Sequence, residues 1–134
     1  MPSANLDLVR SIYADWERGD WTHTEWAHPE IEYVIPDGPA PGRWTGLAGM
    51  ATAWRDMLGA WTDLQSRAEC YRELDEERVL VLPRFSTRGR ASGVDLPETL
   101  GRHAALFHIN SGRVIRLVFY WDRERALADL GLER

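Results

Sequence analysis

Apolar residues recur at helical spacing in two stretches of the chain. The first stretch predicts a helix over residues 5–18, capped by Ser3 or Asn5 and ended by Gly19, and its apolar positions are Leu6, Val9, Ile12, Tyr13 and Trp16. The second predicts the main second helix over residues 45–61, with apolar positions at Leu47, Met50, Trp54, Met57, Leu58 and Trp61. Between them, residues 20–29 predict a short helix with Asp20 as N-cap and Pro29 as terminator, followed by an alternating strand at 30–35.

The second half of the chain has the pattern of strands. Strands are predicted at about 65–74, 78–90, 101–109 and 114–122, and the turn "NSG" joins the last two. The segment "RERALADLG" then predicts a short C-terminal helix that ends at Gly131. Helices followed by an antiparallel meander favour an α+β domain whose helices lie on one face of a curved sheet.

Composition narrows the class of protein. The 134 residues fit one domain, 1–134, and a net charge of −5 with no run of Lys or Arg argues against nucleic acid as a partner. No apolar run has the length of a membrane span or the form of a signal peptide, so a soluble cytoplasmic protein is expected. Cys70 is the single cysteine and is expected to be a buried, inert thiol. Seven tryptophans predict a large apolar interior.

Four motifs, in their order along the chain, point to a known family. They are "YADWERGDW", "WAHPEIEYVIPDG", "GRWTG" before a helix, and "FHINSGRVIRLVFYWD". Together they resemble the SnoaL-like branch of the nuclear transport factor 2-like superfamily, which has a ketosteroid isomerase or polyketide cyclase-like fold. The resemblance implies a cone-shaped curved antiparallel sheet wrapped around the N-terminal helices, an internal apolar pocket, and a dimer through the outer face of the sheet.

The catalytic groups of that family are missing from the matching positions. The tyrosine and two aspartates of the ketosteroid isomerase-like members fall on Ile12, Ala105 and Ile35, and the His/Asp pair of the polyketide cyclases falls on Ala105 and Phe119. This fold hosts isomerases, cyclases, hydrolases and non-catalytic binders. Two functions therefore stay open: an enzyme that applies acid/base chemistry to a small apolar or aromatic ligand, and a ligand-binding or scaffold domain without turnover.

Strand periodicity selects His103 as the best candidate for polar chemistry in the pocket. It shares a face with Ala105 and Phe107, and its poorly hydrated imidazole is expected to be neutral and able to act as a general base. Tyr33 is the second candidate catalytic group, with a core tyrosine as the alternative, and Asp37 is a further polar candidate. The candidate ligand-binding residues are Trp16, Ile35, Trp54, Arg84, Phe107, Phe119 and Trp121.

The orientation of Arg84 has two interpretations. When the strand is matched to the family by Pro83, Leu80, Leu82, Arg84 and Ser86 face inward. A bulge at the proline would instead turn Arg84 to solvent and place Phe85 in the core.

His108 and Asp122 are predicted to lie outside the pocket. Asp122 precedes the C-terminal helix and is expected to cap it, whereas His108 is expected on the outer face of the sheet. An apolar stripe in water on that face predicts a homodimer, and its residues are Leu106, His108, Val118 and Tyr120. Since His23 and His28 are five residues apart, a metal site is not expected, and no cofactor is predicted.

Overall fold

A six-stranded sheet with helices on both faces forms the framework of the molecule. The computed structural model describes residues 4–18, 20, 23–37, 41–59, 61–62, 65–86, 89–90 and 103–132, with the backbone alone at 56–59, 61–62, 65–66, 85–86 and 89–90. The helices are α1 (Ala4–Glu17), α2 (Gly46–Gly59) and α3 (Arg123–Asp129). The strands are β1 (Ala27–Ile35), β2 (Gly42–Thr45), β3 (Trp61–Thr62), β4 (Gln65–Glu73), β5 (Arg78–Ser86), β6 (Gly89–Arg90), β7 (Ala104–Asn110) and β8 (Arg113–Tyr120). Within this described part, no helix is both long and apolar enough to cross a membrane.

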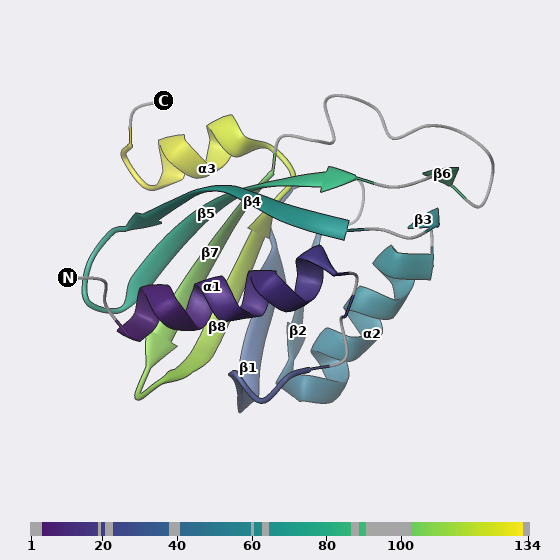
Figure 1. The fold of residues 1–134 in the computed structure, drawn as a ribbon, viewed down its shortest axis with the longest axis horizontal. Helices are drawn as coiled ribbons and strands as arrows, with labels where there is room; N and C mark the ends of the chain where they lie inside the picture. The colour runs from purple at the N-terminus through teal and green to yellow at the C-terminus, as the bar shows by residue number, and fades with distance from the viewer. Residues whose placement is uncertain are drawn as a thin grey trace.

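The main sheet is mixed and open. Its strand order is β2-β1-β8-β7-β5-β4, and β3 pairs with β6 in a separate two-stranded ladder. All pairings in the main sheet are antiparallel except that of β1 with β8, which is parallel. The two long helices and the curved sheet give the predicted α+β architecture of a cone (Figure 1). In this parallel pair, the first strand along the chain lies beside the last.

The helices α1 and α2 cover the inner face of the sheet. α1 packs against β4 and β5, whereas α2 packs against β1 and β2. The apolar face predicted for α1 is confirmed, because Val9, Ile12, Tyr13 and Trp16 are buried. On α2, Met50 and Trp54 are buried, as predicted, while Leu6 of α1 is only partly buried against the same core. The side chains of Met57, Leu58 and Trp61 lie outside the described residues.

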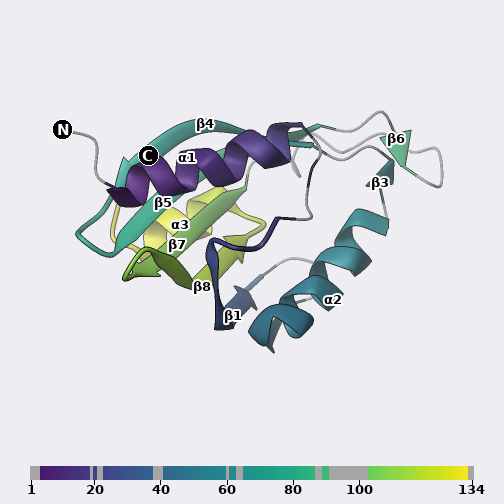
Figure 2. The ribbon, with the colours of Figure 1, turned by 60° about the horizontal axis from the view of Figure 1, so that its bottom comes forward.

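The outer face of the sheet carries its own apolar cluster beneath α3. Figure 2 shows α3 behind the strands, on the side opposite α1. Ala126 and Leu127 of α3 pack onto Leu106, Val118 and Tyr120. The predicted apolar stripe in water is therefore wrong, because the C-terminal helix of the same chain buries three of its four members.

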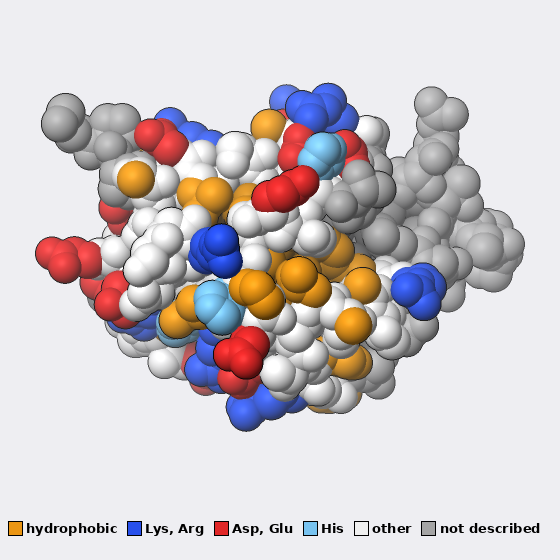
Figure 3. All heavy atoms as spheres, turned by 90° about the horizontal axis from the view of Figure 1, so that it is seen from below, with side chains coloured by type: hydrophobic (Ala, Val, Ile, Leu, Met, Phe, Trp, Pro, Cys, Tyr) orange, Lys and Arg blue, Asp and Glu red, His pale blue; other side chains and the backbone are white. Residues whose placement is uncertain are grey.

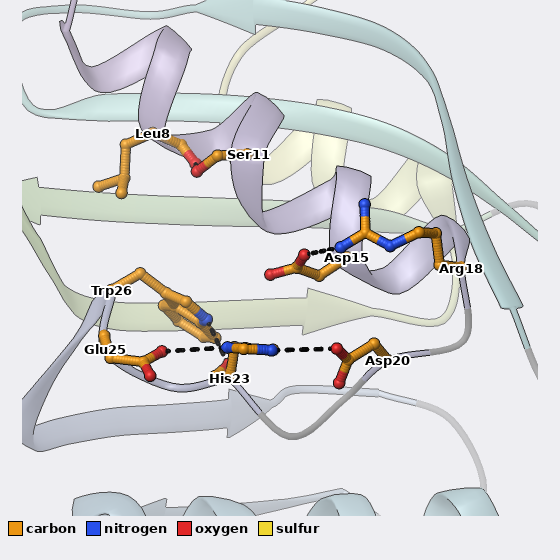
Figure 4. Close-up of polar contacts among 8 residues, drawn as sticks. All are labelled: Leu8, Ser11, Asp15, Arg18, Asp20, His23, Glu25 and Trp26. Atoms are coloured by element: carbon orange, nitrogen blue, oxygen red, sulfur yellow. Dashed lines mark hydrogen bonds and ion pairs between the residues drawn. The ribbon is translucent and has the colours of Figure 1, made fainter.

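Residues 20–29 do not form the predicted short helix in their described part. A turn at Glu25–Trp26 leads directly into β1, which begins two residues before Pro29. The Trp26 indole N–H donates to the His23 carbonyl over 2.9 Å, and the His23 imidazole lies between Asp20 and Glu25, 3.1 and 3.7 Å from their carboxylates (Figure 4). Pro29 is compatible with a strand because it lies in the irregular stretch of β1 between Ala27 and Glu32, the residues on either side that pair with β8.

Two further elements differ from the sequence predictions. Residues 42–45, where the sequence analysis predicts no strand, form β2, in which Trp44 lies opposite Tyr33. Gly46 follows with φ of +81°, a left-handed conformation that favours glycine at the junction between β2 and α2. Cys70 is exposed rather than buried, because β4 is an edge strand and Cys70 does not face the core.

Candidate functional site

An aromatic network lines the inner face between the two long helices and the sheet. Trp16 of α1 contacts Trp54 of α2 at 5.4 Å and Trp26 at 5.9 Å between ring centroids. The ring centroid of Trp54 lies 6.3 Å from that of Tyr33, and the centroid of Tyr33 lies 5.8 Å from that of Trp44. These edge and tilted contacts join α1, α2, β1 and β2 into one apolar wall.

Two buried tyrosines place hydroxyl groups within this wall. Burial raises the pKa of the Tyr33 phenol, and a hydrogen bond from the Trp54 side chain acts in the opposite direction. Burial also raises the pKa of Tyr13 well above its usual value, and the neighbouring Tyr71 and Tyr33 add to that effect. Both phenols are therefore protonated at neutral pH and can donate a hydrogen bond.

Tyr13 is a candidate that the sequence interpretation assigned only to the core. It lies one residue after Ile12, the position that matches the tyrosine of the ketosteroid isomerase-like members, and its ring lies 6.0 Å from Phe107 and 6.2 Å from Tyr71. Arg10 stands over the Tyr71 ring at 5.5 Å, on the more exposed side of the same helix. The helical spacing of Val9, Ile12, Tyr13 and Trp16 already indicated that the Tyr13 side chain lies on the buried face of α1.

His103 lies in a second aromatic group at the other end of the inner face. Its side chain is buried, with 1% of the residue exposed, and its ring lies 5.2 Å from both Phe119 and Trp121. Loss of hydration lowers the pKa of His103 to about 3, and the positive charge of Arg123 contributes in the same direction. The prediction that this imidazole faces inward is confirmed, and the direction of its pKa shift agrees with the neutral form expected from the sequence.

His103 and Tyr33 lie at different levels along the sheet, His103 just before the start of β7 and Tyr33 level with the middle of β7 and β8. Tyr33 lies opposite Leu117, Leu117 lies opposite Phe107, and His103 precedes Phe107 by four residues. With a rise of about 3.3 Å per residue and about 4.8 Å per strand, their Cα atoms are roughly 16 Å apart. A ligand that contacts both must therefore extend across the row of Ala105 and Phe119.

Most of the predicted ligand-binding residues lie on this inner face. Trp16, Trp54, Phe107 and Phe119 are buried in the inner core, and Ile35 and Trp121 are partly buried against it. Of the two interpretations of Arg84, the inward one is wrong, and the arginine is exposed as the other expected. Val79 and Val81 face the inner core, Leu80 and Leu82 belong to the outer cluster, and Arg84 is exposed. The bulge next to Pro83 lies in β4, between Ala68 and Cys70, so β5 keeps its alternation and Arg84 follows the outer residues.

The remaining polar candidates have structural contacts. The Asp122 carboxylate accepts a hydrogen bond from the Glu124 amide over 3.0 Å, so the predicted N-cap of α3 is confirmed. Asp37 accepts from the backbone amides of Trp121 and Asp122 over 2.8 and 3.0 Å. His108 lies on the outer face, paired across the strands with Arg116 and Arg78, and burial together with these two cations lowers its pKa. Among the described residues, no three His, Cys, Asp or Glu side chains gather as a metal site would require.

Figure 3 views the molecule from below, from the side on which β1 begins. Hydrophobic side chains gather in a band across the middle of this face, and charged groups border the band on several sides. This side of the molecule therefore presents apolar as well as charged side chains at its surface.

Comparison with solved structures identifies the fold. A protein of unknown function from Burkholderia pseudomallei, described as NTF2-like, superposes with a TM-score of 0.76 at 18% identity, over 94% of this chain and 96% of that one. The chain has the nuclear transport factor 2-like fold. No family model matches the sequence, and no curated protein does.

Two other structural neighbours carry more specific descriptions. TerC, co-crystallised with polyporic acid, has a TM-score of 0.74 at 20% identity, over 96% of this chain and 98% of TerC. A candidate SnoaL-like polyketide cyclase from Jannaschia has a TM-score of 0.65 at 15% identity, over 87% of this chain and 83% of that one. Identities this low establish a common fold and leave function to the residues of the site.

Proposed function

We propose that the chain binds a small, mostly apolar or aromatic ligand against the inner face of its sheet, with neutral His103 as the hydrogen-bonding group at one end. The observation that carries this proposal is a buried, uncharged imidazole walled by Phe119 and Trp121. Small-molecule sites combine apolar and aromatic walls with a few polar groups that fix the orientation of the ligand. Tyr33 and Tyr13 supply such groups at the other end of the face.

Binding without turnover is the form of the proposal that the electrostatics favour. A general base is most effective when its pKa lies near the working pH, and His103, with a pKa of about 3, is a weak base at neutral pH. Its two nitrogens can still donate one hydrogen bond and accept another. The alternative is an enzyme of the isomerase, cyclase or hydrolase type, in which a bound ligand changes the surroundings of His103 enough to raise its pKa.

The first experiment measures binding of polyporic acid, the compound present in the TerC crystals, by thermal shift and calorimetry. We expect the wild-type protein to be stabilised by this probe, and His103→Leu to bind it up to about tenfold more weakly through loss of one hydrogen bond. His108→Gln is the matched control, because His108 lies on the same strand but on the opposite face. Equal affinities of the two variants would remove His103 from the site.

A second measurement separates binding from catalysis. After incubation with the protein, the probe is recovered and analysed by mass spectrometry. Recovery of the unaltered compound supports the binding function. A chemically changed product supports the enzyme, and in that case His103→Leu should lower its rate of formation by about 10²–10⁴-fold.

A further inference from the structure

The carboxylate of Asp37 connects the segment that follows β1 to the segment that follows β8. Asp37 lies two residues beyond β1, and its Oδ1 and Oδ2 accept hydrogen bonds from the consecutive amides of Trp121 and Asp122, over 2.8 and 3.0 Å. β1 and β8 run parallel, with Val34 opposite Val118, so Asp37 and Trp121 come level three residues later. The side chain therefore holds together two segments whose backbones no longer pair in the register of the sheet.

The segment held by Asp37 forms one wall of the His103 site. The Trp121 ring stands edge-on to the imidazole, at 5.2 Å and 83°, and also contacts Phe119 at 6.0 Å. The position of the Trp121 backbone thus decides where the indole meets the imidazole.

A second connection runs from the same segment through α3. Asp122 caps this helix, and Arg123, its first residue, donates from Nε to the His103 carbonyl over 3.1 Å and from Nη2 to the Pro83 carbonyl over 3.0 Å. The Arg123 guanidinium is partly buried and also lies 3.5 Å from the Glu69 carboxylate. Asp37 is therefore linked to both the ring and the backbone of His103.

We propose that Asp37 is a positioning residue for the His103 site, fixing the imidazole through the Trp121–Asp122 segment. The chemistry of a carboxylate suits this role, because its two oxygens each accept from one amide and both hydrogen bonds are charge-assisted. An asparagine offers one acceptor oxygen and turns an N–H₂ group toward the other amide. The consequence for ligand binding rests on the proposed function, whereas the effect on the imidazole does not.

The chain contains a control for this substitution at another aspartate that binds backbone amides. Asp75, in the turn between β4 and β5, accepts through Oδ1 from the amides of Glu77 and Arg78, over 2.8 and 2.9 Å, and through Oδ2 from Nε of Arg78 over 2.8 Å. Asp75→Asn makes the same substitution in the turn before β5, whereas Arg123 contacts Pro83 toward the other end of that strand. Comparison of the two variants separates positioning of His103 from general loss of stability.

The experiment follows the His103 ring by NMR in protein labelled at histidine, without ligand. Ring currents of Phe119 and Trp121 act on the Cε1–H resonance, so Asp37→Asn should shift this resonance, and Asp75→Asn should leave it in place. Looser packing of Trp121 admits water, so the His103 pKa should also rise in Asp37→Asn from about 3 toward its ordinary value near 6.5. Asp37→Glu, which keeps both oxygens on a longer side chain, should give a smaller change in the same direction, and it decides the question if Asp37→Asn does not fold.

Two results would overturn the proposal. One is an unchanged His103 resonance in both Asp37 variants, and the other is an equal change in Asp37→Asn and Asp75→Asn. Because no ligand is present, either result counts against Asp37 alone. Failure of the ligand-binding proposal would instead be seen in the wild-type protein, as a lack of probe binding.

Discussion

The neutral imidazole of His103 couples the stability of the protein to pH. In the unfolded chain a histidine binds a proton near pH 6.5, whereas in the folded protein His103 does so only near pH 3. Between these values the unfolded state holds one more proton, so the free energy of unfolding falls as the pH decreases from about 6.5 to about 3. The slope from this group is about 1.4 kcal/mol per pH unit.

Urea unfolding of wild type and His103→Gln across this pH range tests that coupling. Glutamine has no proton to gain, so we expect the variant to lose stability less steeply than wild type as the solution is acidified. His108→Gln removes a second histidine whose pKa is lowered, so it should also flatten the curve, and the two variants together divide the pH dependence between the two histidines. Parallel stability curves for wild type and His103→Gln would mean that His103 is hydrated or charged in the folded protein.

The inward direction of His103 could be predicted because alternation along β7 is regular, since the extra residue of the bulge near its end lies in β8. Arg84 could not be placed with the same method. Its prediction depended on which strand accommodates the irregularity near Pro83, and the pattern of a single strand does not show that its partner carries the extra residue. The contacts of Asp37 with Trp121 and Asp122 were also beyond sequence reasoning, because they span 84 and 85 residues.

At the scale of elements, α3 depends on its N-cap. Asp122 has an extended backbone, with φ of −112° and ψ of 111°, and its carboxylate accepts from the Glu124 amide. We expect Asp122→Ala to lower the free energy of unfolding by about 1 kcal/mol, and Asp122→Asn to change it little, because asparagine caps equally well. Chemical denaturation of the three proteins measures the difference. A similar loss in both variants would show that the charge, rather than the capping oxygen, stabilises the helix.

The long elements followed from periodicity, and the short ones did not. α1 and α2 present apolar stripes over several turns, so their existence and positions were predictable to within a few residues. β2 is only four residues long. It begins at Gly42, directly after Pro41, and Gly46 follows it, and glycine and proline at such positions usually indicate turns. Its strand conformation comes from pairing with β1, a contact that local sequence does not encode.

At the scale of the whole molecule, α3 changes which part of the outer face is available to a partner. Leu106, Val118 and Tyr120 are covered, so an apolar homodimer interface there is unsupported. A polar row across the strands remains, formed by Thr45, Glu32, Arg116, His108 and Arg78. The Glu32 carboxylate lies 3.8 Å from Arg116 of the row. It also lies 3.1 Å from Arg43, which is on β2 outside the row.

We therefore expect any homodimer through this face to be held by charge. In a two-fold interface the row of one subunit meets the same row of the other, so Glu32 can face a cation of the partner subunit. Such contacts weaken with salt, because charges on a solvated surface are screened beyond about 10 Å at 0.1 M ionic strength.

Sedimentation at low salt should show association that high salt and Arg116→Ala both weaken. Arg125→Ala, on the exposed side of α3, should leave it unchanged. A monomer at micromolar concentration under every condition would contradict the dimer itself, and equal effects of the two arginine substitutions would assign it to another surface.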